Sequence, residues 1–119
     1  MITKGLVKLG LLQGEVEQLV KDEAYKPFFM HKTSHWLGMD VHDVGNYYLG
    51  GKARPLEAGM VLTVEPGIYI ARDNDKVPPA FRGIGVRIED DILVTDGAPD
   101  NHTQAIPKTV AEVQRASAA

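Results

Sequence analysis

Apolar residues in the first quarter of the chain recur at helical spacing but are interrupted by glycine. Residues 6–12 carry leucine and valine that could share one helix face, and Gly10 is expected to end this first helix. A second run over residues 14–25 has glutamates early, lysines late and Pro27 after it, a charge order that suits the helix dipole. The pattern therefore predicts two short N-terminal helices.

Further along the chain, aliphatic and β-branched runs replace the helical pattern. Residues 28–30 predict a short strand that leads into a glycine-rich, irregular segment. Residues 60–64 and 68–70 also predict strands, and Pro66 lies between them. Because proline has no N–H to donate to a ladder, we expect a bend or bulge at this position.

The second half of the chain carries the longest strand pattern, over residues 83–95. Within it, Arg87 and Glu89 alternate with valine and isoleucine, so one face of this strand is charged. Residues 102–106 predict a final strand, and a proline is expected to open a C-terminal helix over residues 107–115.

Composition narrows the class of protein. The 119 residues are 44% hydrophobic and 24% charged, which is ordinary for a folded domain, and the length predicts one core. The net charge is -3 with scattered basic residues, so we expect no nucleic acid or anionic membrane as partner. No apolar run approaches the roughly 20 residues of a membrane span. Cysteine is absent and no signal-peptide pattern is seen, so we expect a cytoplasmic location.

Candidate metal ligands stand out against this background. Three of the four histidines fall within residues 31–43. Together His35, Glu65 and Glu89 offer one imidazole and two carboxylates, a set that suits Mn, Co, Fe or Zn better than Mg or Ca. Both glutamates sit among aliphatic residues, where an uncompensated charge is costly. A metal ion is one way to compensate them, and an ion pair of Glu89 with Arg87 on a solvated sheet face is the alternative.

Other residues allow more than one interpretation. His42, between two aspartates, could donate a proton, stabilise an oxyanion or simply stabilise its loop through a hydrogen bond. Trp36 and Tyr69 could wall a pocket, although aromatic side chains more often serve packing. The sequence contains no glycine-rich phosphate loop, nucleophile elbow or cysteine-based motif.

Three motifs resemble the Xaa-Pro aminopeptidase (aminopeptidase P) family. They are His-Lys-Thr-Ser-His-Trp-Leu-Gly-Met-Asp-Val-His-Asp, Leu-Thr-Val-Glu-Pro-Gly and Val-Arg-Ile-Glu-Asp-Asp. The resemblance covers nearly the whole chain. It implies an α+β fold of the creatinase or methionine-aminopeptidase "pita-bread" type, with a curved, mostly antiparallel sheet and flanking helices. Residues 1–119 would form a single truncated catalytic domain that corresponds to the C-terminal half of that fold.

The resemblance also implies a dinuclear metal centre, usually Mn, with Zn or Co as further candidates. In the family, two aspartates, one histidine and two glutamates hold the metals. By resemblance, His35 is the histidine ligand, Glu65 a ligand near the attacking water and Glu89 the bridging glutamate. The family's two aspartates lie upstream of the histidine, where this sequence has only Asp22, on a predicted helix. Two ligands of the dinuclear centre are therefore expected to be missing, and low metal occupancy is expected.

Further roles follow from the same resemblance. His31 and His42 match non-ligand histidines that bind substrate and stabilise the tetrahedral intermediate, and Arg87 matches an arginine near the proline-binding pocket. Trp36 and Tyr69 remain candidate substrate contacts. The implied substrates are proline-containing peptides, from which the family releases the N-terminal residue before proline.

The missing ligands leave several functions open. The isolated chain is expected to be a weakly active or inactive metallopeptidase. Alternatives are a non-catalytic half-domain that binds peptides or proteins, a homodimeric pseudo-enzyme, or a gene fragment without a function of its own. Because the second half of a pita-bread domain would expose an apolar face, we expect homodimerisation or pairing with a missing N-terminal half.

Overall fold

The computed structural model describes residues 1–118. Contacts between residues divide the chain into two compact units, and each unit combines two separate segments. The first unit comprises Met1–Lys32 and Pro66–Arg87, and the second comprises Thr33–Glu65 and the residues from Ile88 onward. Because each unit takes residues from both halves of the sequence, the units are not successive domains. The single domain over residues 1–119 stays a prediction, and residue 119 lies outside the described residues.

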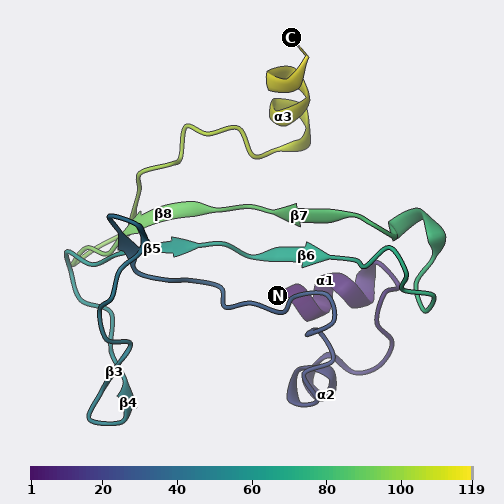
Figure 1. Cartoon of the computed structure of the whole chain (residues 1–119), viewed down its shortest axis with the longest axis horizontal. Coiled ribbons are helices and arrows are strands. Elements are labelled where there is room, and N and C mark those ends of the chain that lie inside the picture. Colours follow the sequence, from purple (N-terminus) through teal and green to yellow (C-terminus); the bar gives the residue numbers. More distant parts are fainter. Residues whose placement is uncertain (119) are drawn as a thin grey trace. The chain divides into compact units, whose positions relative to one another are not determined.

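The first unit contains short helices and one strand pair (Figure 1). Its elements are α1 (Ile2–Lys8), α2 (Val16–Lys21), β6 (Gly67–Tyr69), the 3-10 helix η1 (Pro79–Phe81) and β7 (Gly85–Arg87). Strands β6 and β7 pair antiparallel. The predicted end of the first helix is confirmed, because α1 closes before Gly10, which takes a φ of +72° that glycine adopts readily. The second helix is shorter than predicted and gives way to turns at Asp22.

An apolar core holds the first unit together. Its buried members are Leu6, Leu11, Phe28, Ile70 and Val77, with Ile2, Leu12, Tyr25, Ile68 and Phe81 packed against them. These side chains come from both segments of the unit, so their burial joins the N-terminal helices to the β6–β7 region.

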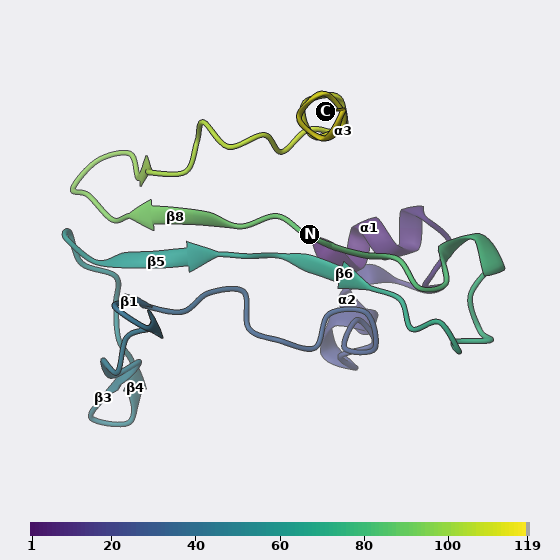
Figure 2. The same cartoon turned by 45° about the horizontal axis from the view of Figure 1, so that its top comes forward.

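The second unit is built from antiparallel strands and ends in a helix (Figure 2). Its sheet has the order β5 (Val61–Val64), β8 (Asp90–Leu93) and β9 (Asp100–Asn101). Two hairpins precede the sheet, β1 (Leu37–Gly38) with β2 (Val41–His42) and β3 (Tyr48–Leu49) with β4 (Lys52–Ala53). The chain continues into α3 (Val110–Ser117).

Two strand predictions, for residues 28–30 and 83–95, were wrong or incomplete. Residues 28–30 form no strand, because the N–H groups of Phe28 and Phe29 turn back to the carbonyl of Tyr25. The long run over residues 83–95 is divided into β7 and β8 at residues 88–89, which have no ladder partners. Its partner run is interrupted at Pro66, which has no N–H for the ladder, so the break predicted there affects both strands.

At the C-terminal end, residues 102–106 form turns, and the strand lies earlier, at β9. The last helix starts later than predicted, after Thr109. The hydroxyl of Thr109 accepts from the N–H of Glu112, whose carboxylate accepts from the N–H of Thr109 in return. This capping box satisfies N–H groups that a helix start leaves free. None of the helices within residues 1–118 has the length and apolar composition that a membrane span requires.

Candidate metal centre

Strand β5 delivers the first candidate ligand. Residues two apart in a strand point to the same face, so Thr63 and Glu65 lie side by side at its end. The Thr63 hydroxyl donates to Glu65 Oε1 at 3.0 Å, and the N–H of Glu65 donates to the carbonyl of Thr33 at 2.8 Å. Glu65 is only 7% exposed, so its carboxylate is fixed at a buried position.

The second candidate ligand comes from the segment that runs beside β5. The N–H of Thr63 donates to the carbonyl of His35 at 2.9 Å, and the next residue, Trp36, bridges to Leu62 in antiparallel fashion. These bonds place the His35 imidazole next to the Glu65 carboxylate, with Nε2 3.4 Å from Oε1.

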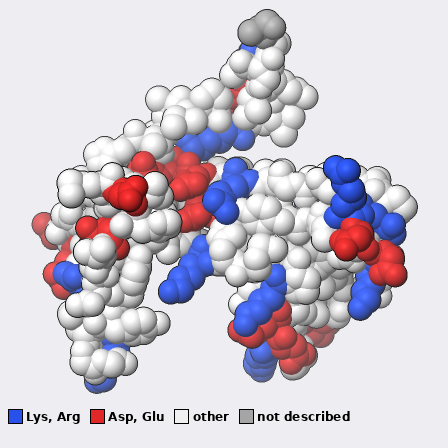
Figure 3. All heavy atoms as spheres, viewed as in Figure 1, with Lys and Arg blue, Asp and Glu red and all other residues white. Residues whose placement is uncertain are grey.

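Glu89 completes the group from the residue before β8. One ligand atom each of His35, Glu65 and Glu89 lie within 4.8 Å of one another. We call these three residues the ligand cluster; all belong to the second unit. On the face shown in Figure 3, acidic side chains gather over the region of β8, the strand that begins with Asp90 and Asp91. Lys108 offsets part of this charge, because its Nζ lies 2.9 Å from Asp90 Oδ1.

The tautomer of His35 suits a metal ligand. Its Nδ1 lies 3.0 Å from the carbonyl oxygen of Trp36. Because a carbonyl only accepts hydrogen bonds, Nδ1 carries the proton, and the lone pair of a neutral ring is then on Nε2, the nitrogen that faces Glu65. Metal-bound histidines commonly hold their other nitrogen in this way. The donors therefore fit a divalent metal ion, although three protein donors leave coordination positions open.

A strained turn sets the position of His42. The N–H of His42 donates to the carbonyl of Asp40 at 2.7 Å, which closes a γ-turn around Val41 with φ +64°. A β-branched residue seldom takes this conformation. The turn brings the His42 ring to 4.2 Å from the His35 ring, measured between centroids. His42 therefore lies beside one member of the ligand cluster, while its chemical role stays a prediction.

His31, Tyr69 and Arg87 form a second group, within the first unit, which we call the arginine cluster. The Tyr69 hydroxyl lies 2.9 Å from His31 Nε2 and accepts from Arg87 Nε at 2.6 Å. Arg87 also lies over the Tyr69 ring, 5.7 Å from its centroid. Tyr69 thus links His31 and Arg87 through one hydroxyl group.

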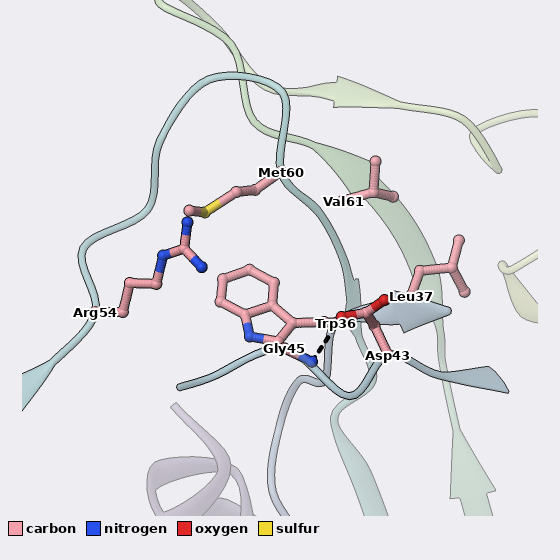
Figure 4. A pocket seen from close by; sticks show the side chains of 7 residues that line it. All are labelled: Trp36, Leu37, Asp43, Gly45, Arg54, Met60 and Val61. Atoms are coloured by element: carbon pink, nitrogen blue, oxygen red, sulfur yellow. Dashed lines mark hydrogen bonds between the residues drawn. The ribbon is translucent and has the colours of Figure 1, made fainter. Parts of the chain in front are cut away.

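Trp36 lines a pocket of the second unit that contains no member of the ligand cluster. It stacks on Tyr47 with 5.5 Å between ring centroids and lines a pocket with Arg54 and Met60 among others (Figure 4). Its Nε1 and the Nε of Arg54 are buried and have no hydrogen-bond partner within residues 1–118. The side chain is not part of the ligand cluster, so its role in substrate binding stays a prediction.

Comparison with known protein families identifies the family of this chain. The sequence model of metallopeptidase family M24 matches residues 1–96. The chain belongs to metallopeptidase family M24. Members of this family use divalent metals, which agrees with the donor set of the ligand cluster.

Relatives of this M24 chain are Xaa-Pro aminopeptidases. It is 54% identical over 114 residues to the Xaa-Pro aminopeptidase of Escherichia coli (strain K12), covering 96% of this chain and 25% of that protein. It is 44% identical over 123 residues to Xaa-Pro aminopeptidase 1 of Streptomyces coelicolor, covering 100% of this chain and 24% of the relative.

The solved structures to which the chain is similar are also aminopeptidases. Pseudomonas aeruginosa aminopeptidase PepP matches with a TM-score of 0.91 and 60% identity, over 96% of this chain and 26% of that chain. Aminopeptidase P from E. coli with the inhibitor Pro-Leu matches with a TM-score of 0.87 and 54% identity, over the same shares. The M24 chain thus spans about a quarter of the length of its relatives. Its helices and antiparallel strands are those of part of a pita-bread domain, as predicted.

Sequence reasoning missed one residue of this M24 site. Thr63 contacts both His35 and Glu65, yet it was not among the candidates. Its signal was the spacing, because a hydroxyl two residues before a buried strand carboxylate lies on the same face.

Proposed function

We propose that this chain binds one divalent metal ion through His35, Glu65 and Glu89 and acts on proline-containing peptides. The reaction is that of its relatives, release of the N-terminal residue before proline. The observation that carries the proposal is the convergence of three donor atoms within 4.8 Å in a member of family M24. Manganese is the proposed metal, with zinc and cobalt as alternatives for the same donor set.

Each residue has a distinct task in this proposal. A bound divalent ion supplies Lewis acidity that polarises a peptide carbonyl and makes water nucleophilic at neutral pH. Glu65, placed beside His35, is the group that accepts a proton from the attacking water. His42 donates a hydrogen bond to the oxygen on which charge develops.

The arginine cluster binds the peptide in the same proposal. Arg87 and His31 are linked through the Tyr69 hydroxyl, and the positive charge of the Arg87 guanidinium suits a peptide carbonyl or carboxylate. Tyr69 offers an aromatic surface on which a proline ring can lie.

The isolated chain should have weak or no hydrolytic activity. By resemblance, the family's centre uses two further aspartates, whereas three donors gather in the part of the chain that the structure describes. A two-metal site would hold the attacking water and stabilise the oxygen of the tetrahedral intermediate together, which one ion would do less well. The same observation favours a second candidate function, that of a non-catalytic peptide-binding half-domain or homodimeric pseudo-enzyme.

Pairing with another chain would change this expectation. In the first unit, Ile84 and the β7 residue Val86 are exposed, and exposed apolar side chains favour association. We propose a homodimer or a complex with a chain that supplies the missing aspartates. Light scattering at micromolar concentration should give a mass above that of the monomer, and a monodisperse monomer would contradict this pairing.

Metal binding and hydrolysis should be measured on the same preparation. Calorimetric titration with MnCl₂ is expected to give one site in the natural chain and none in Glu89→Ala. An Xaa-Pro peptide is then incubated with both proteins, so that the variant controls for contaminating peptidase. Turnover above that of Glu89→Ala supports the enzyme, metal binding with peptide binding but no turnover supports the binding half-domain, and the absence of metal binding overturns the proposed site.

A further inference from the structure

Thr63 is the most deeply buried polar residue of the second unit. It is 1% exposed and sits in the middle of β5, where a valine would fit the strand equally well. Its hydroxyl nevertheless makes two hydrogen bonds. It accepts from the N–H of His35 at 3.1 Å and donates to Oε1 of Glu65 at 3.0 Å. One buried oxygen therefore joins the backbone of one candidate ligand to the side chain of another.

The contact with His35 departs from an ordinary antiparallel ladder. Two residues that face each other in such a ladder exchange N–H to carbonyl bonds in both directions. Here the N–H of Thr63 donates to the carbonyl of His35, but the N–H of His35 donates to the Thr63 hydroxyl. The side chain of Thr63 thus replaces a main-chain acceptor and ties the segment that carries His35 to β5.

We propose that Thr63 is a positioning residue that orients His35 and Glu65 for metal binding. The inference rests on the proposed metal site and adds to it the residue that fixes the geometry of two ligands. A hydroxyl has a single proton, so with the N–H of His35 as donor to its oxygen, that proton goes to Glu65. This hydrogen bond fixes Oε1 and with it the orientation of the carboxylate beside His35.

Loss of the two hydrogen bonds of the Thr63 hydroxyl is costly because Thr63 is buried. Without the hydroxyl, the partly buried N–H of His35 loses its acceptor and the buried Glu65 carboxylate loses a donor, and each loss carries a desolvation cost. Partners of this kind typically change metal affinity about 10–100-fold when removed. The threonine side chain is also stiff about χ1, so it holds the hydroxyl in one place.

Thr63→Val tests the proposal because it keeps the shape and removes the hydroxyl. The 119-residue chain is titrated with CoCl₂, and the visible absorption of bound Co²⁺ reports both affinity and ligand geometry. We expect Thr63→Val to bind Co²⁺ about 10–100-fold more weakly and with an altered spectrum. Thr63→Ser keeps the hydroxyl and should retain the affinity and spectrum of the natural chain.

Two controls separate positioning from folding. Thr95→Val removes a hydroxyl that donates to the carbonyl of Ala98 in the same unit, and it should leave Co²⁺ binding unchanged. Amide hydrogen exchange without metal should be faster for His35 in Thr63→Val but not in Thr63→Ser. This second measurement reports the hydrogen bond independently of any metal.

Each outcome has a defined meaning. Equal Co²⁺ affinity and spectrum in Thr63→Val and the natural chain overturn the positioning role while the metal site stands. Equal losses in Thr63→Ser and Thr63→Val also overturn it, because the hydroxyl would then not be the cause. If the natural chain binds no Co²⁺, the proposed metal site fails, and the positioning role fails with it.

Discussion

In the first unit, the side chains removed from water are mainly hydrocarbon, whereas in the second they are Thr63 and Glu65. All buried hydrophobic side chains within residues 1–118 belong to the first unit. The second unit instead buries a hydroxyl and a carboxylate and relies on strand ladders and hairpins. Apolar burial stabilises a unit without any ligand, but a buried carboxylate needs compensation.

The polar clusters of the two units differ in how their side chains are held. The ligand cluster of the second unit is held by backbone bonds and a buried hydroxyl. In the arginine cluster of the first unit, side chains contact side chains, and the guanidinium bond to Tyr69 is exposed. We infer that the apolar core stabilises the first unit, while a bound cation would stabilise the second.

The largest expected effect is on the apolar core. Leu6→Ala should destabilise the first unit by about 2–5 kcal/mol, because Leu6 is completely buried and its removal leaves a cavity. Leu9→Ala, at an exposed position near the end of the same helix, should change stability by less than about 0.5 kcal/mol. Urea unfolding of both variants checks this. Equal effects would mean that the first unit is not held by its core.

A bound metal ion should stabilise the second unit and not the first. At about 100 times the dissociation constant, Mn²⁺ or Co²⁺ should stabilise the second unit by about 2.7 kcal/mol. Hydrogen exchange should therefore slow in β5 and β8 and remain unchanged in β6 and β7. His35→Ala should abolish the response. Slowing of similar size in both units would break the distinction between them.

Gly38→Ala should destabilise the second unit at its first hairpin. A Cβ at Gly38 would overlap the backbone nitrogen of Asp43, so the β1–β2 hairpin must shift and carry His42 with it. Crowding of this kind costs about 1–3 kcal/mol. Gly5→Ala is the matched control, because nothing lies near that position and α1 should gain up to about 1 kcal/mol. Thermal unfolding distinguishes the two, and a Gly38→Ala chain as stable as the natural one would contradict the tight hairpin.

Tyr69→Phe should have a smaller effect that is confined to the arginine cluster. It removes the hydroxyl shared by His31 and Arg87, whose loss should weaken binding of an Xaa-Pro peptide by about 1 kcal/mol, roughly fivefold. Metal affinity should not change. Tyr48→Phe, at an exposed tyrosine of the second unit, serves as control. Fluorescence titration with a labelled peptide provides the measurement, and a parallel loss of metal affinity would show that the clusters are not independent.

The smallest expected effect is a loss of stability in acid. Hydrogen bonds from Thr103 and Lys108 lower the pKa of the Asp90 carboxyl below its ordinary value. A group whose folded pKa is lowered stabilises the fold above its unfolded pKa, and this contribution is lost as the pH falls through the folded value. Stability should therefore decline as the pH falls below about 4, the ordinary aspartate pKa.

Asp90→Asn isolates this contribution in the second unit. The difference in unfolding free energy between the natural chain and the variant should shrink as the pH falls. A difference that stays constant between neutral and acidic pH would mean that the carboxylate does not supply it.

The sequence predicted those parts of the fold that have a local cause. Gly10 ends the first helix and Pro66 interrupts the ladder, and both effects depend on one residue. The hairpins at β1–β2 and β3–β4 were not predicted, because strands of two residues are too short to show periodicity. The break at residues 88–89 is not a property of those residues but of the partner strand that faces them.

The candidate site was predictable in kind but not in its supporting contacts. Residue types and the family resemblance identified His35, Glu65 and Glu89 as a set, and the structure brings their donor atoms together. The γ-turn at Val41 could not be foreseen, because a β-branched residue normally avoids a positive φ. Thr63 was overlooked because threonine is common in strands and its hydroxyl gains meaning only from the residue across the ladder.

The chain passes from one unit to the other after residues 32, 65 and 87. During synthesis, the helices of the first unit emerge long before β6 and β7 can cover them, and His35 and Glu65 emerge before Glu89. Neither unit can thus be finished until late in translation. A protease that cut at any of these crossings would release products that each contain an incomplete unit. Each unit is completed only when its second segment has been made, and a single cut at any crossing divides at least one of them.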